Sequence, residues 1–172
     1  MADRITAEDR KQVDGTRLID ELGIDQQQIA WRKDFTNFEQ ADEKRLSELN
    51  SVVEPVIDDA VEDCYEYFGS YDETLEIFGR SSKGIEALKQ NQREYLKGLF
   101  DGEYGQSHFE TRARIGKIHD MLDLGPKIYL GAYSIFYRQL IDAVVDDLKT
   151  NLAQTDGGTA EQQSGSLTPE GA

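Results

Sequence analysis

The chain contains few of the residues from which cross-links and metal clusters are built. Its 172 residues include one cysteine and two histidines. A single cysteine excludes an internal disulfide, a four-cysteine zinc site and an iron–sulfur cluster, and it favours a reducing compartment. Two histidines supply a conventional zinc or copper site poorly. The composition therefore argues against the common multi-ligand metal sites.

Basic residues and long apolar runs are also scarce. The chain has 19 basic against 34 acidic residues, which gives a formal net charge of −15. Such a surface repels the phosphates of nucleic acids and of anionic lipids. No apolar run approaches membrane-spanning length, and the first thirty residues do not resemble a targeting segment. The acidic residues are dispersed, which suits work at high salt, where self-repulsion is screened. We expect a cytoplasmic, halophilic protein without nucleic-acid or membrane contact.

The sequence lacks the alternation of apolar and polar residues at period two that is typical of a half-buried strand. Its apolar residues recur at helical spacing instead. The clearest stripe runs through 85–99, where Ile85, Leu88 and Leu96 share one face. The longest predicted helix opens at Pro126 and extends to about Leu152. The sequence therefore predicts an all-α fold.

The predicted boundaries of helices and domains follow from changes in composition and from the position of proline. Residues up to about Asp14 are polar and predicted to be irregular. One helix is predicted from about Asn37, and Pro55 is predicted to open another. Polar and small residues dominate 153–172, which predicts a flexible linker or tail after a domain over 1–152.

The most informative helix is predicted to start at Ser107, because Glu110 three residues later completes a capping-box pattern. It carries Ile115, Ile118 and Leu122 at helical spacing, with His119 on or beside this apolar stripe. Gly125 and Pro126 then separate it from the next helix. A histidine in this position is either a core residue hydrogen-bonded to a backbone carbonyl or a haem-iron ligand. The pattern alone leaves both interpretations open.

Other side chains give weaker signals. A di-iron bundle needs Glu-x-x-His pairs, but glycines stand three residues before both histidines, at Gly105 and Gly116. Tyr65 and Tyr129 border apolar stripes, where tyrosines commonly pack. Asn91 could point into the interior or hydrogen-bond solvent. A Gly-rich phosphate loop and a nucleophile elbow are both absent, so no enzymatic activity is predicted.

Two consecutive segments nevertheless resemble a known family. The segments are Arg112-Ala113-Arg114-Ile115-Gly116-Lys117-Ile118-His119 and Leu124-Gly125-Pro126-Lys127-Ile128-Tyr129-Leu130-Gly131-Ala132-Tyr133. They resemble the proximal-histidine segment of globin-coupled sensors, in particular the sensor domain of haem-based aerotaxis transducers in a haloarchaeal form. The similarity covers roughly Leu18 to Leu152.

The resemblance implies a globin-like fold with an extra N-terminal helix before Asn37, and a role for each matching residue. His119 would be the proximal ligand of haem b, held non-covalently because a C-x-x-C-H motif is absent. Tyr65 would donate a hydrogen bond to bound oxygen. Leu88 would line the ligand side of the pocket with Asn91, and Tyr129 would orient His119. The implied cofactor-binding set on the proximal side is Ile115, Ile118, Leu122, Tyr129 and Tyr133.

Three departures accompany the resemblance. Asn91 stands where a relative has threonine, and Ile128 where a relative has tryptophan. The final globin helix is expected to be missing, since a polar tail follows the long helix. The resemblance implies an oxygen or diatomic-gas sensor that dimerises through its long C-terminal helix and signals to a methyl-accepting domain outside this chain. The alternatives are a haem-free globin-like signalling module and a haem enzyme acting on oxygen or nitric oxide.

Overall fold

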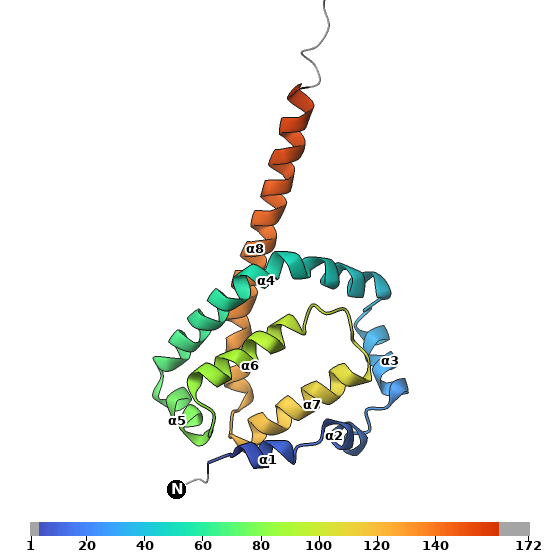
Figure 1. The fold of residues 1–172 in the computed structure, drawn as a ribbon. Coiled ribbons are helices and arrows are strands. Elements are labelled where there is room, and N and C mark those ends of the chain that lie inside the picture. Colours follow the sequence, from blue (N-terminus) through green and yellow to red (C-terminus); the bar gives the residue numbers. More distant parts are fainter. Residues whose placement is uncertain (1–3, 162–172) are drawn as a thin grey trace, which may run out of the picture.

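The computed structural model describes residues 4–161, with side chains described as far as residue 155. These residues form eight helices (Figure 1). Within them, the one strand-type pairing is an isolated bridge between Ile5 and Ser81. The predicted all-α class is confirmed. The helices are α1 (Ala7–Lys11), α2 (Gly15–Glu21), α3 (Gln26–Phe35), α4 (Gln40–Gly69), α5 (Asp72–Arg80), α6 (Ile85–Lys97), α7 (Gln106–Met121) and α8 (Pro126–Glu161).

The N-terminal residues are more ordered than their polar composition predicted. Thr6 and Asp9 form a capping box that starts α1. Arg10 is buried and donates hydrogen bonds to the hydroxyls of Ser81 and Ser82, at 2.7 and 3.0 Å. The prediction of an irregular segment up to Asp14 was therefore wrong. These long-range bonds fix α1 against the connection between α5 and α6, and local sequence patterns carry no information about them.

The two helices predicted on either side of Pro55 are one helix. Proline lies inside α4, which bends in Figure 1. Proline removes one backbone donor and usually kinks a helix, but packing can hold the two halves together. The second half of α4 supplies most of the buried core against α6 and α8. The core cluster is Ile57, Ala60, Val61, Cys64, Leu96, Ala132 and Phe136.

Helix α7 begins one residue before the predicted Ser107 and ends at Met121, before the predicted stop at Gly125 and Pro126, and its cap differs from the prediction. Gly105 is the N-cap, without a side-chain hydrogen bond. The Glu110 carboxylate accepts from the amide of Gln106 instead, at 2.9 Å, so the Ser107–Glu110 capping box is wrong. On its outer side α7 packs closely on α2. A Cβ at Gly15 would stand 2.6 Å from the Glu110 carbonyl oxygen, so only glycine permits this approach.

Helix α8 packs on α4 and then continues beyond the rest of the molecule (Figure 1). It extends to Glu161, so residues 153–161 continue the helix where a flexible tail was predicted. The remainder of that predicted tail, 162–172, lies outside the described residues. One face of α8 exposes apolar side chains at spacings of three, four or seven residues. They are Leu130, Tyr137, Ile141, Val145, Leu148 and Leu152.

Candidate functional site

His119 lies in the last turn of α7, on the half-buried side of the helix. Burial lowers the pKa of its imidazole, which favours the neutral ring. Its ring makes no hydrogen bond to any residue of the described part of the chain. A core histidine would be expected to bond a backbone carbonyl, and that interaction is absent between residues 4 and 161. The ring nitrogens of His119 are therefore available to a ligand.

Of the predicted proximal residues, Tyr129 contacts this ring. Tyr129, in the first turn of α8, stacks on His119 with ring centroids 6.1 Å apart and an interplanar angle of 21°. Ile115 and Ile118 are half-buried on α7, and Leu122 is buried just after the helix ends. The turn through Gly125 and Pro126 joins α7 to α8, so the last turn of α7 and the first turn of α8 supply the two aromatic rings.

Tyr65 lies on α4. Its ring stacks on Phe78 of α5 at 5.5 Å and meets Phe68 edge-on at 6.1 Å. Burial raises the pKa of its phenol, so the hydroxyl stays protonated as a donor. That hydroxyl has no hydrogen-bond partner among the described residues. Two aromatic rings thus hold in place a phenol whose polar end is unsatisfied.

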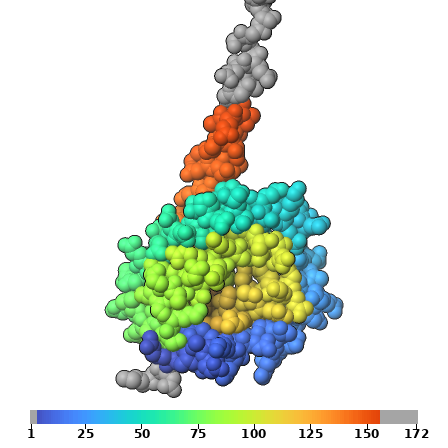
Figure 2. Space-filling model, viewed as in Figure 1, coloured from blue at the N-terminus to red at the C-terminus, as the bar shows by residue number. Residues whose placement is uncertain are grey.

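The packing of α7 against its neighbouring helices is uneven. No residue within α7 is fully buried. Helix α7 packs extensively on α2, but it makes no comparably extensive contact with α6 or α8. Figure 2 shows the surface hollowed between α6 and α7. An apolar helix face that is neither packed nor fully exposed is typical of a binding site.

Leu88 and Asn91, the two predicted site residues on α6, differ in their exposure. Leu88 is half-buried. Asn91 is exposed, and its carboxamide oxygen accepts from Lys83 Nζ at 3.0 Å. Of the two alternatives that the sequence left open for Asn91, the structure has the one at the surface, and its role towards a bound ligand stays a prediction. The buried side of α6 follows Leu88, Gln92 and Tyr95, and Asn91 stands at the edge of that stripe.

Tyr95, Arg112 and Tyr133 form a polar cluster between α6, α7 and α8, and of these residues the sequence predicted only Tyr133. A hydrogen bond with Tyr95 of α6, followed by burial, raises the pKa of Tyr133 to about 12. The guanidinium carbon of Arg112 lies 4.5 Å from the centre of the Tyr95 ring. Arg112 Nη2 is buried and has no hydrogen-bond partner within residues 4–161. A sequence signal existed, because Arg112 stands seven residues before His119 on an otherwise apolar face, but the missing partner is visible only in the structure.

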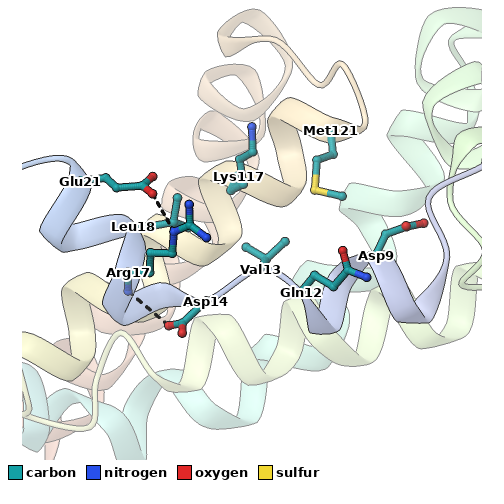
Figure 3. Close-up of a pocket in the computed structure, with 9 residues that line it drawn as sticks. All are labelled: Asp9, Gln12, Val13, Asp14, Arg17, Leu18, Glu21, Lys117 and Met121. Carbon is teal, nitrogen blue, oxygen red and sulfur yellow. Dashed lines mark hydrogen bonds and ion pairs between the residues drawn. The ribbon is translucent and has the colours of Figure 1, made fainter.

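Another groove, with a cavity volume of about 310 Å³, lies between α1, α2 and the opposite side of α7 (Figure 3). Acidic and basic side chains line much of it, including Asp14, Arg17 and Lys117, and Arg17 is already paired with Glu21 at 2.7 Å. It contains none of the predicted site residues. We therefore place the functional site on the His119 side of α7.

The donor set restricts what the site can bind. Over the described residues, no group of three or more histidine, cysteine, aspartate or glutamate side chains could hold a metal ion. None of the helices described is long and apolar enough to cross a membrane. A metal at His119 would have to bring most of its own ligands, as the iron of a porphyrin does.

Comparison with known proteins agrees with this arrangement. The protoglobin family matches residues 25–159. The chain is similar to the haem-based aerotactic transducer HemAT of Halobacterium salinarum (strain ATCC 700922 / JCM 11081 / NRC-1), with 44% identity over 144 residues. This match covers 84% of the chain but only 29% of the relative. No solved structure is significantly similar to the chain.

The family match extends over most of the chain, from α3 into the projecting part of α8. It includes every residue that forms the His119 side of the site. The chain therefore belongs to the protoglobin family, and its resemblance to globin-coupled sensors, predicted from the sequence, is confirmed.

Proposed function

We propose that this chain is a haem-based sensor of oxygen or another diatomic gas, with His119 as the proximal ligand of non-covalently held haem b. The observation that carries the proposal is the state of His119. Burial lowers the pKa of its imidazole, the ring has no hydrogen bond in the described chain, and it lies on a helix in which no residue is fully buried.

The residues present suit this cofactor. The neutral imidazole is the form that binds iron. Half-buried apolar side chains beside it, Ile115 and Ile118, provide a surface for a flat apolar ring. The stacking of Tyr129 on His119 restricts rotation of the imidazole and so fixes the direction of its nitrogen. Tyr133 and Leu88 would complete the lining from α8 and α6.

When bound, ferrous haem supplies reversible binding of a diatomic gas. The protein would supply selectivity through Tyr65, whose phenol is held by Phe68 and Phe78 and has no acceptor of its own. A hydrogen bond from this donor stabilises a ligand that accumulates negative charge more than one that stays neutral. Oxygen would therefore be favoured over carbon monoxide. We do not include Asn91, because its amide faces Lys83.

We further propose that the signal leaves through α8. The relative is named a transducer, and this chain spans 29% of its length, so a methyl-accepting signalling domain would lie outside the present sequence. The exposed apolar face of α8 would bind a second copy, since its spacing of three, four and seven residues is that of helices that pair along a seam. Sedimentation of wild type and of a Leu148→Glu, Leu152→Glu variant tests this. A dimer that persists in the variant would contradict it.

The two alternatives predicted from the sequence remain testable beside the sensor. The absorption spectrum of the purified protein, supplied with haem, separates them. We expect a Soret band that shifts on reduction and again on exposure to oxygen. A protein that takes up no haem would be a haem-free signalling module. Sustained oxygen or nitric oxide consumption by the reduced protein would indicate an enzyme instead.

A further inference from the structure

Arg112 is the one residue with a fully buried polar side-chain atom, Nη2, that has no hydrogen-bond partner in the part of the chain that the structure describes. A buried charged group without a partner is strongly unfavourable, so proteins normally pair such groups. Its described contact is with the face of the Tyr95 ring, at 4.5 Å. An aromatic face attracts the positive charge but accepts few of the five guanidinium N–H donors.

The absence of an acidic partner is unusual in this chain. It has 34 acidic residues, and Arg93 on α6, for comparison, pairs with both Asp58 and Glu62 at 2.8 and 2.6 Å. Two carboxylates lie in the same region, since Asp101, Glu43 and Arg112 all influence the pKa of Tyr104. Glu43 is paired with Lys33 at 2.6 Å, and Asp101 accepts a hydrogen bond from the backbone N–H of Glu103 at 3.0 Å. The charge of Arg112 contributes, after burial, to lowering the pKa of His108, and Tyr133 also faces it. The fold thus leaves a guanidinium without a described carboxylate, although carboxylates are abundant.

The position of Arg112 relative to His119 indicates what the missing partner is. The two residues are seven positions apart on α7, which places them two turns apart on the same face, separated by about 10 Å along the helix axis. The half-buried Ile115 lies between them on that face. A flat ring bound at His119 and covering Ile115 would bring its edge towards Arg112.

We propose that Arg112 binds a carboxylate side chain of the haem and so selects the orientation in which the ring enters the pocket. This inference rests on the proposed function. A guanidinium recognises a carboxylate through two parallel N–H donors, and the unsatisfied Nη2 is one of them. The Tyr95 ring, itself hydrogen-bonded to Tyr133, would hold the guanidinium plane in place from α6.

The test compares two ligands, haem and haem dimethyl ester, in which both carboxylates are esterified. The rate at which each is lost to an excess of a haem-scavenging apoprotein is measured for wild type, Arg112→Gln and Arg112→Lys. We expect wild type to release the ester about tenfold faster than haem, because esterification removes a charge-assisted interaction. Arg112→Gln should release haem about as fast as wild type releases the ester, and should distinguish the two ligands little. Arg112→Lys should lie between.

The matched control is Arg93→Gln, which removes an arginine that already has acidic partners and should leave both rates unchanged. If Arg112→Gln retains the full difference between haem and ester, Arg112 does not bind a carboxylate and the inference is overturned. The same holds if wild type releases the two ligands equally. If wild type binds neither ligand, the proposed function itself has failed, and that result is distinct from the other two. The wild-type comparison involves no substitution and is therefore independent of any folding defect in the variants.

Discussion

The helix pair α4 and α8 and the helix α7 bury their apolar residues to different extents. Ile57, Ala60 and Val61 of α4 are completely buried, and Phe136 of α8 is buried against them. Within α7 no side chain is fully buried, although Ile115 and Ile118 recur there at helical spacing. The apolar residues of the first region are covered by packing. The second region leaves apolar area partly exposed, and its imidazole and Arg112 Nη2 have no hydrogen-bond partner among the described residues, as is typical of a ligand-binding site.

The largest effect should come from removing the proposed iron ligand on α7. His119→Ala should lose its haem during purification, because the other histidine of this helix, His108, lies about three turns away near its beginning. His108 is the control, since it is the second histidine and lies on the same helix, in contact with Tyr104 and Phe109. His108→Ala should keep a haem-to-protein ratio near that of wild type. Full haem content in His119→Ala, with an unchanged ferrous spectrum, would assign the ligand elsewhere.

The second prediction compares the two regions directly through isoleucine truncation. Ile57→Ala should lower the free energy of unfolding by about 2–5 kcal/mol, since it creates a cavity in a packed core. Ile118→Ala should lower it by about 1 kcal/mol or less in the haem-free protein, because few packed neighbours lose contact. Urea unfolding of both haem-free variants measures the two values. Equal losses would mean that α7 is packed as tightly as α4.

The third prediction concerns the phenol of Tyr65 on α4. Tyr65→Phe should accelerate oxygen release on the order of ten- to a hundredfold, because a hydrogen bond to a partly charged acceptor contributes about 1.5–3 kcal/mol. Carbon monoxide release should change little. Stopped-flow measurements on Tyr67→Phe provide the control, as Tyr67 is exposed on the same helix and bonds the Tyr71 hydroxyl at 2.8 Å.

Two outcomes would overturn this assignment of Tyr65. Equal acceleration of both gases would indicate that its ring acts only by size. Faster oxygen release in Asn91→Ala, with Tyr65→Phe unchanged, would make the amide the donor, against its observed bond to Lys83.

The smallest expected effect is a pH dependence of the haem-free protein. Burial lowers the pKa of His119 in the folded state below the value of about 6.5 that the unfolded chain has. As pH falls through about 6.5, the unfolded state binds a proton that the folded state resists, so the free energy of unfolding decreases. His119→Gln should reduce this decrease between about pH 7.5 and about pH 5.5. Because carboxylates titrate in both proteins, only the difference between them is informative. Identical pH profiles would show that the ring is solvated.

Much of the site was predictable because its signals are local. Ile115, Ile118 and Leu122 recur at helical spacing with His119 among them, and Gly125 and Pro126 mark the turn to α8, so short-range geometry alone places Tyr129 near the imidazole. The all-α class and the acidic, dispersed surface were determined in the same way, by periodicity and composition.

What only the tertiary structure decided concerns partners that are distant in the chain. Pro55 lies inside a single helix because packing holds both halves, and α1 is ordered because Arg10 reaches Ser81 and Ser82. Asn91 faces Lys83, and Arg112 lies over Tyr95 without an acidic partner in the described chain. Each of these outcomes depends on which side chain a third element brings within hydrogen-bonding distance. A local pattern predicts that a helix has two faces, but only the packing of the other helices determines which face is satisfied and which is left for a ligand.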